Sequence, residues 1–184
     1  INELDELVDE ILLSSRLDAA NADIGQLELV ELTEIVKDEC IRMPAQLTAE
    51  PVTIVGSSKL LRRLIRNLIE NAHKYAKPQS QSGSEVAQQV EVTLKLEKIE
   101  AEDWVIIQVD DNGPGVPEDQ RIRIFEPFYR MRGASEKDGG VGLGLALVQS
   151  IAKRHDGVAI CQERPGGGAR FIVKMPLMPL GAEE

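Results

Sequence analysis

The chain has 184 residues, of which 42% are hydrophobic and only 3% aromatic, so aliphatic side chains must dominate the core of one domain with at most a short appendage. Its formal net charge of −10 disfavours a nucleic-acid-binding surface, because phosphate contacts need clustered Lys and Arg. The two cysteines, Cys40 and Cys161, are far apart and no CxxC pair occurs, which favours buried free thiols in a reducing compartment over a metal site.

The beginning of the chain predicts a helix over residues 2–17. Its apolar seam is narrow, which suits a partner helix, although a helix packed on its own domain would show the same pattern. The residues of this seam are Leu4, Leu7, Val8 and Ile11. The segment that follows, residues 19–26, is predicted to be a linker.

Residues 27–76 predict strands that alternate with helices. In chain order these elements are a strand over 27–31, a helix over 32–43, a strand over 51–56 and a long helix that ends near residue 76. Thr33 is expected to cap the first of these helices and Ser57 or Ser58 the second, because a hydroxyl oxygen there can accept a free N–H group of the first turn.

The second half of the chain predicts strands on both sides of a further helix. After a polar loop over 77–89, the predicted elements are strands at 90–98 and 104–110, a short helix at 118–124, a helix at 142–155, and strands at 158–163 and 169–175. This order of helices and strands indicates an α+β fold, a two-layer α/β sandwich with helices on one face of a mixed sheet.

The long helix before residue 76 shows three faces, where an ordinary amphipathic helix shows two. One face is apolar. A second is basic and is expected to be solvated, and it consists of Arg62, Arg66, His73 and Lys77. The third is a polar stripe, bordered by Tyr75, that consists of Asn67, Glu70, Asn71 and Lys74. Because this stripe combines neutral oxygen acceptors, an anion and a cation, it could bind a metal cation and a phosphate together, although an exposed polar helix edge would show the same residues.

Two glycine-containing segments follow. In VDDNGPGVP, residues 109–117, a strand delivers Asp110 and Asp111 to a turn, where a carboxylate can accept a hydrogen bond from an exocyclic amine such as that of adenine. In GGVGLGLALV, residues 139–148, glycines open a helix, whose free N–H groups and dipole favour a phosphate. The second segment matches neither the dinucleotide-binding fingerprint nor the P-loop. A common turn and a helix start suited to tight packing are the alternative explanations.

A third segment, IFEPFYR at residues 124–130, places two of the chain's three Phe residues around a proline. This predicts that Phe125 and Phe128 form a hydrophobic anchor at the base of a loop. Arg130, Arg132 and Lys137 belong to that loop or its start, and each could reach a phosphate. A surface turn with solvated charges is the alternative.

Taken together and in this order, NLIENAHKYA, DNGPGVP, IFEPFYR and GGVGLGLALV resemble the N, G1, F and G2 boxes of bacterial sensor histidine kinases. The resemblance covers roughly residues 27–176 and implies the Bergerat-type ATP-binding sandwich that gyrase, Hsp90, histidine kinases and MutL share. Residues 1–18 resemble the last part of the dimerisation and phosphoacceptor hairpin of these kinases, and residues 177–184 would form a C-terminal tail.

The resemblance also implies roles for individual residues, with ATP and Mg²⁺ as the cofactors. Asn71 would coordinate Mg²⁺, and Asp111 would read the adenine amine. The catalytic set would consist of Asn67 near the triphosphate, Lys74 on a phosphate, and Glu70, which helps to orient or deprotonate the incoming histidine. Phe125 would help Phe128 to anchor an ATP lid. The remaining residues implied in ATP binding are Tyr75, Gly113, Gly115, Phe128, Arg130, Gly140, Val141, Gly142, Leu143 and Gly144.

The function implied by the resemblance is transfer of the γ-phosphoryl group of ATP to a histidine on an upstream hairpin, for relay to an aspartate of a response regulator. His73 lies on the basic helix face and His155 at a helix end, where a cation is favourable, so the acceptor is expected upstream of this chain. The chain begins with Ile rather than Met and would be a fragment of a homodimeric kinase. No signal peptide or apolar run of about 18 residues is visible, and the resemblance implies a cytoplasmic domain of an inner-membrane sensor protein.

Two other functions are compatible with parts of the pattern. An ATP-hydrolysing clamp of the gyrase or MutL type would carry Glu four residues before the metal-binding Asn, where this chain has Asn67. A non-catalytic module would sense nucleotide, or would only dimerise through its first helix.

Overall fold

The computed structural model describes residues 3–18, 27–76, 87–131 and 142–177 of the chain. Within these residues the helices are α1 (Glu3–Asp18), α2 (Leu32–Arg42), α3 (Ser58–Tyr75) and α4 (Gly144–Arg154). The strands are β1 (Glu28–Glu31), β2 (Gln46–Ala49), β3 (Thr53–Gly56), β4 (Val90–Ile99), β5 (Glu102–Asp111), β6 (Val158–Glu163) and β7 (Ala169–Pro176). Two short 3₁₀ helices, η1 (Glu118–Gln120) and η2 (Arg123–Phe125), lie between β5 and α4.

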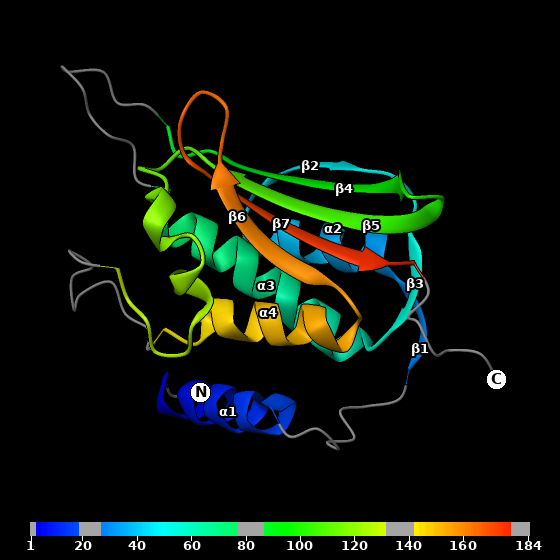
Figure 1. Ribbon diagram of the computed structural model, residues 1–184, viewed down its shortest axis with the longest axis horizontal. Coiled ribbons are helices and arrows are strands. Elements are labelled where there is room, and N and C mark those ends of the chain that lie inside the picture. The colour runs from blue at the N-terminus through cyan, green and yellow to red at the C-terminus, as the bar shows by residue number, and fades with distance from the viewer. Residues whose placement is uncertain (1–2, 19–26, 77–86, 132–141, 178–184) are drawn as a thin grey trace.

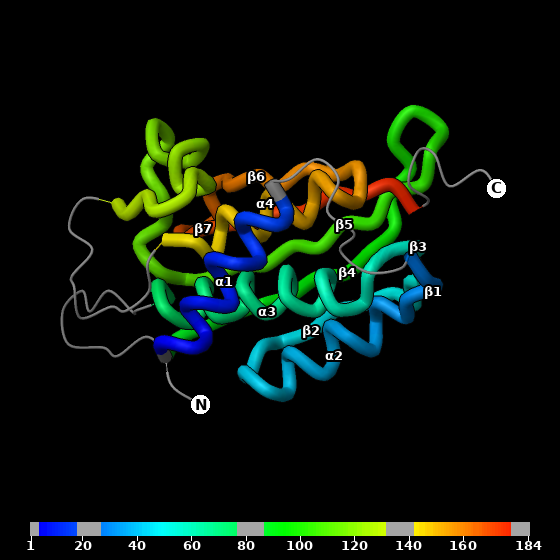
Figure 2. Tube along the Cα trace, turned by 90° about the horizontal axis from the view of Figure 1, so that it is seen from below, coloured from blue at the N-terminus to red at the C-terminus, as the bar shows by residue number. Residues whose placement is uncertain are grey.

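The structure confirms the predicted sandwich. Five strands form one mixed sheet in the order β2-β4-β5-β7-β6, and α2, α3 and α4 cover one of its faces (Figure 1). β2 runs parallel to β4, whereas the other neighbours in the sheet are antiparallel. β1 and β3 form a separate antiparallel pair. The helices and the sheet thus form two layers, with α1 added on the outer side of the helices (Figure 2).

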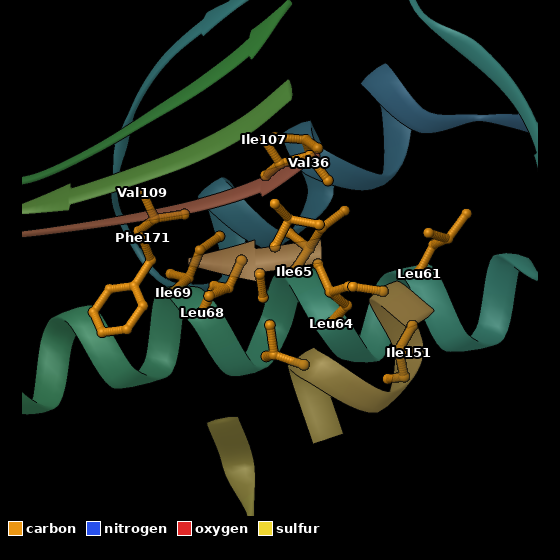
Figure 3. Packing of buried hydrophobic residues seen from close by; sticks show 14 of the residues in the cluster. Val36, Leu61, Leu64, Ile65, Leu68, Ile69, Ile107, Val109, Ile151 and Phe171 are labelled. Carbon is orange, nitrogen blue, oxygen red and sulfur yellow. The ribbon is translucent and has the colours of Figure 1, made fainter. Parts of the chain in front are cut away.

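The core lies between α3 and the sheet. The apolar face of α3 is fully buried and contributes Leu61, Leu64, Ile65, Leu68 and Ile69. Figure 3 shows Ile65, Leu68 and Ile69 in the layer between α3 and the sheet residues Ile107, Val109 and Phe171, and Leu64 nearer to Ile151 of α4. Burial of one such side chain contributes roughly 1.5–3 kcal/mol. The apolar face therefore fixes how α3 sits on the sheet, and it leaves the polar stripe at the edge of the contact.

The two predicted helix caps have different outcomes. Ser57 caps α3, because its hydroxyl oxygen accepts a hydrogen bond from the Leu60 N–H at 3.3 Å. Thr33 does not cap α2, so that prediction is wrong. Its hydroxyl instead donates to the carbonyl of Glu50 at 3.1 Å and accepts from the Val52 N–H at 2.8 Å. Thr33 therefore ties α2 to the segment between β2 and β3.

The arginines of the basic face of α3 are only partly solvated, because α2 packs beside them. Glu39 of α2 is only 1% exposed and accepts hydrogen bonds from three guanidinium groups. Arg66 donates to it at 2.8 and 3.1 Å, Arg42 at 2.7 Å and Arg62 at 3.4 Å. Burial by itself raises the pKa of Glu39, but the hydrogen bonds from Arg66 and Arg42 outweigh it and lower the pKa from 4.5 to about 2.

Replacing Glu39 with Gln is expected to lower the free energy of unfolding by about 2 kcal/mol near neutral pH, because three arginines lose a shared anion. The folded pKa of about 2 lies below the ordinary 4.5, so the stabilisation is fully present above the ordinary pKa and disappears as the pH falls through the folded one. Urea unfolding at about pH 7 and about pH 3 should show a smaller difference between the variant and the wild type at the lower pH, which lies between the ordinary and the folded pKa. An equal difference at both pH values would contradict this account.

Neither histidine has the environment expected from its position. His73 is half-buried rather than solvated, and Lys77, expected beside it, lies outside the described residues. His155 is buried at the end of α4, and burial lowers its pKa, so it is neutral near pH 7 and the expected cation is wrong. Its Nδ1–H donates to the Ile151 carbonyl at 2.8 Å, and its Nε2 accepts from the Ser57 N–H at 3.1 Å. His155 therefore joins the end of α4 to the start of α3.

Other departures from the predicted elements lie where pairing is distant in sequence. β2 was not predicted, because it is four residues long and its partner β4 begins more than forty residues later. The short helix predicted at 118–124 is two separate 3₁₀ turns.

The hairpin predicted between β4 and β5 is confirmed, with Glu100 and Ala101 at positive φ in its turn. Cys40 and Cys161 are buried free thiols, as predicted, and burial raises the pKa of each to about 11.

α1 packs on its own domain, but not through its predicted seam. Leu17 is buried and Leu13 is packed against the core cluster, where α1 contacts α4. Arg154 of α4 also donates to the Leu17 carbonyl at 3.4 Å. An apolar stripe of α1 remains exposed, and it consists of Leu4, Val8, Ile11 and Leu12. No helix within the described ranges has both the length and the apolar character needed to cross a membrane.

Candidate functional site

A pocket of about 320 Å³ lies among the second half of α3, the turn after β5 and the start of α4. Every residue of the predicted polar stripe lines it, together with Tyr75. The other predicted site residues that line it are Asp111, Gly115, Arg130, Gly142, Leu143 and Gly144. Residues far apart along the chain thus meet around one cavity, among them Asn67 and Gly144, which are 77 positions apart.

The polar stripe faces the pocket because helical spacing puts residues three and four apart on the same side of α3. Asn67 is buried, and its Nδ2 donates to the Gly144 carbonyl at 3.2 Å, which joins α3 to the first residue of α4. Lys74 places its Nζ 5.3 Å from the centroid of the Tyr75 ring. The stripe therefore presents an amide, a carboxylate and a cation to one cavity.

Asp111 is the buried carboxylate of the pocket. It is 2% exposed, and its Oδ1 accepts hydrogen bonds from the Gly113 N–H at 2.9 Å and the Ala169 N–H at 3.4 Å. Burial raises the pKa of Asp111, and neighbouring Asp110 raises it further, whereas these two backbone hydrogen bonds lower it. Both hydrogen bonds use Oδ1, so Oδ2 keeps its lone pairs for a donor on a ligand.

Gly113 and Gly115 are needed for different reasons in the turn after β5. A Cβ on Gly113 would lie 2.2 Å from the Tyr75 carbonyl oxygen, so this glycine allows the end of α3 to approach the turn. Gly113 does not line the pocket. Gly115 does, and it has a φ of +77°, a conformation that favours glycine. The turn is therefore shaped by one packing glycine and one conformational glycine.

The start of α4 meets the IFEPFYR segment through the backbone. Gly142 has a φ of +80°, and a Cβ there would lie 2.8 Å from the Tyr129 carbonyl oxygen. The Phe128 N–H donates to the Gly142 carbonyl at 3.0 Å. No side chain caps the first turn of α4, so its free N–H groups and the positive end of its dipole remain open to an anion.

The two phenylalanines of that segment do not act alike. Phe125 is buried and packs edge-on against Phe171, with ring centroids 6.2 Å apart, as a hydrophobic anchor should. The side chain of Phe128 is 63% exposed, so the structure does not support a hydrophobic anchor at this residue. Its φ of +64° instead turns the backbone towards Gly142. Tyr129 lines the pocket, and its hydroxyl donates to the side chain of Gln120.

Some predicted residues lie outside the described part of the chain. These are Gly140, Val141, Arg132 and Lys137. No group of three or more His, Cys, Asp or Glu side chains that could hold a metal ion comes together within the described residues.

Several pocket residues were not predicted. Glu10 of α1 reaches the pocket and forms an ion pair with Arg63 of α3 at 3.2 Å, and burial raises the pKa of its carboxyl. The packing of α1 on the domain brings Glu10 to the pocket, and no local sequence motif predicts this position. The apolar part of the wall includes Val116, Ile124, Met131, Leu145 and Phe171. Ile124 belongs to the predicted segment IFEPFYR, whereas Phe171 comes from β7, which carries no local signal for a site.

The chain also matches known proteins. Residues 56–179 match the family model of histidine kinase-, DNA gyrase B- and HSP90-like ATPases. The chain is 31% identical over 184 residues to the sensor histidine kinase CpxA of Escherichia coli, an alignment that covers 95% of this chain and 37% of that protein. The chain therefore spans little more than a third of the length of this curated relative.

Solved structures show the same likeness. The mycobacterial sensor histidine kinase MprB aligns with a TM-score of 0.66 and 25% identity, over 84% of this chain and 100% of that one. Full-length ShkA in complex with AMPPNP aligns with a TM-score of 0.66 and 27% identity, over 97% of this chain and 37% of that one.

Proposed function

The chain belongs to the histidine kinase-, DNA gyrase B- and HSP90-like ATPase family, and from this premise we propose that it is the catalytic part of a protein-histidine kinase. In this proposal the pocket binds ATP with Mg²⁺, and the γ-phosphoryl group passes to a histidine on an upstream helical hairpin. The observation that carries the proposal is that one cavity unites the buried carboxylate of Asp111, the polar stripe of α3 and the uncapped start of α4.

The two ends of the pocket suit the two ends of ATP. The Oδ2 atom of Asp111 can accept a hydrogen bond from the exocyclic amine of adenine, and the apolar wall beside it suits the faces of a purine. At the other end, the free N–H groups of α4 and the cations of Lys74 and Arg130 suit a triphosphate. The volume of about 320 Å³ is within the range of small-molecule sites.

The residues present also suit Mg²⁺ bound together with ATP. Mg²⁺ prefers oxygen ligands and keeps several waters, so the amide oxygen of Asn71 would hold it beside the phosphates. When bound, the ion would neutralise charge on the phosphates. Asn67, tied to the Gly144 carbonyl, would hold the start of α4 against α3 and so fix the phosphate end of the pocket.

Phosphoryl transfer relies on positioning and on neutralising charge. Lys74 would contact the phosphates from α3, and Glu70, at the rim of the same stripe, would accept a hydrogen bond from the incoming imidazole and orient it. Neither His73 nor His155 suits the acceptor role, because His155 is buried with both ring nitrogens occupied and His73 does not line the pocket. We therefore propose that the acceptor histidine belongs to another segment of the parent protein.

A hydrolysing clamp is less well supported than a kinase. Hydrolysis needs a base to activate water. The residue four positions before Asn71 is Asn67, an amide whose Nδ2 already donates to the Gly144 carbonyl. An amide cannot accept a proton near neutral pH, so this position does not supply that base.

The proposal extends to the parent protein, which this chain represents in part. Residues 1–18 would be the end of a dimerisation hairpin, residues 19–26 a linker, residues 27–176 the catalytic domain and residues 177–184 a tail. The exposed apolar stripe of α1 defined above would then pack against the rest of the hairpin. The parent would be a homodimeric membrane sensor with this part in the cytoplasm, and it would pass its phosphoryl group to an aspartate of a response regulator.

Titration calorimetry with ATP, with and without Mg²⁺, tests nucleotide binding directly. We expect Mg²⁺-dependent binding by the wild type. Asn71→Ala should bind Mg·ATP about tenfold more weakly, because one metal ligand is lost, and should equal the wild type when EDTA removes the metal. Absence of binding by the wild type would refute the proposal and would favour the non-catalytic module. A steady ATPase rate that Asn67→Ala abolishes would favour the clamp.

A further inference from the structure

We propose that Arg42 is a positioning residue of the nucleotide pocket, which holds the carboxylate of Glu70 towards α2 and so keeps its charge fixed and neutralised when Mg·ATP binds. The inference rests on the proposed function. Glu70 lines the pocket one position before Asn71, the candidate Mg²⁺ ligand. Arg42 belongs to α2 and does not line the pocket, and Glu70 is the pocket residue to which it donates a hydrogen bond.

Arg42 joins two carboxylates. Its Nε donates to Glu39 Oε2 at 2.7 Å, and its Nη2 donates to Glu70 Oε1 at 3.0 Å. One guanidinium therefore makes both contacts from a rigid planar group, which sets the direction in which Glu70 is drawn.

The support behind Arg42 is rigid. Glu39 is 1% exposed, and Arg66 grips it from α3 through two hydrogen bonds, at 2.8 and 3.1 Å. A buried anion with several donors cannot shift without leaving charges unpaired. The buried carboxylate of Glu39 therefore orients Arg42, although the side chains of Arg42 and Glu70 are each more than a third exposed.

The local charge explains why Glu70 needs such a partner. Glu10 of α1 also lines the pocket, so two carboxylates lie where a triphosphate would enter. Of the two, Glu10 is paired with Arg63 at 3.2 Å and Glu70 with Arg42 at 3.0 Å. Without Arg42, Glu70 would lose its ion-pair partner and would be free to swing towards the metal, with only the more distant charge of Arg66 near it.

A double-mutant cycle tests this directly. Mg·ATP affinity is measured by competition with a fluorescent nucleotide for the wild type, Arg42→Ala, Glu70→Gln and the double variant. We expect Arg42→Ala to weaken Mg·ATP about two- to fivefold at low salt, the range for a partly exposed ion pair, and the loss to shrink as salt is added. In the Glu70→Gln background, Arg42→Ala should cause no further loss.

Arg62→Ala is the matched control. Arg62 contacts Glu39 at 3.4 Å and Asp38 at 3.2 Å, but it has no contact with Glu70 and does not line the pocket. It should destabilise the α2–α3 contact as Arg42→Ala does and leave Mg·ATP affinity within about twofold of the wild type. Thermal melting of all variants verifies that each is folded, and Arg42→Lys should recover part of the affinity because it restores the cation.

Three outcomes would overturn the inference. One is an Arg42→Ala affinity equal to that of the wild type. Another is an equal loss in the Glu70→Gln background, and the third is a loss of the same size in Arg62→Ala. If the wild type itself binds no Mg·ATP, the proposed function fails first and the inference falls with it, so the two failures are distinguished by the wild-type measurement.

Discussion

Replacing Asp111 with Asn is expected to weaken ATP binding by roughly 1–3 kcal/mol, about five- to 150-fold in affinity, because a buried acceptor for the adenine amine becomes a donor. Asn can still accept through one oxygen the hydrogen bonds from the Gly113 and Ala169 N–H groups. Its NH₂ group would then stand where Asp111 offers Oδ2, and would oppose another donor. Competition against a fluorescent ATP analogue measures the change.

Asp110→Asn is the control for that experiment. Asp110 is the preceding residue of β5 and is also buried, but its carboxylate is held by Arg170 at 2.9 and 2.8 Å and does not line the pocket. Its replacement should reduce stability and leave ATP affinity within about twofold of the wild type. Equal affinity of Asp111→Asn and the wild type, or an equal loss in Asp110→Asn, would contradict the assignment of Asp111. Asp111→Ala is less informative, since it would also leave two buried backbone N–H groups without an acceptor.

Gly168→Ala is expected to lower the free energy of unfolding by more than about 3 kcal/mol. Gly168 precedes β7 with a φ of +114°, and a Cβ there would lie 1.9 Å from the Asp111 carbonyl oxygen. That atom is backbone, so no side-chain rotation can relieve the clash, and either β5 or β7 must move. Because the Ala169 N–H next to it donates to Asp111, the same movement should also weaken ATP binding.

Gly166→Ala separates steric clash from backbone strain. Gly166 lies in the same turn with a φ of +89°, but a Cβ there meets nothing within 4 Å. Only the left-handed conformation opposes alanine at this position, so the expected loss is about 1–2 kcal/mol. Urea unfolding of both variants should place Gly168→Ala well below Gly166→Ala. Similar stability of the two would mean that β5 and β7 adjust easily, and the proposed link to Asp111 would fail.

Local patterns in the chain were sufficient to predict the long helix and its polar stripe. The period of Leu61, Leu64, Ile65 and Leu68 requires one buried face, and that face sets the direction in which Asn67, Asn71 and Lys74 point. The capping of α3 by Ser57 could also be predicted from neighbouring residues alone. The four segments NLIENAHKYA, DNGPGVP, IFEPFYR and GGVGLGLALV were recognised together, because the order and spacing of motifs along a chain are visible without any structure.

Contacts between segments distant in sequence could not be predicted in this way. Arg62 and Arg66 were expected in water, yet the buried carboxylate of Glu39 receives both, because α2 packs on that face. His155 was expected as a cation, yet it is neutral, since its ring lies between α4 and the start of α3. Phe128 was expected as a hydrophobic anchor at the base of a loop, yet its backbone has a positive φ and the residue is exposed.

The amino-acid sequence by itself therefore determined the polar stripe, the two glycine-containing segments and the family to which the chain belongs, because periodicity and motif order are properties of the chain alone. Only the tertiary structure decided that Glu10 reaches the pocket and that Arg42 holds Glu70. These pairings depend on how α1 and α2 pack against α3, and packing is set by the fit of whole surfaces rather than by neighbouring residues.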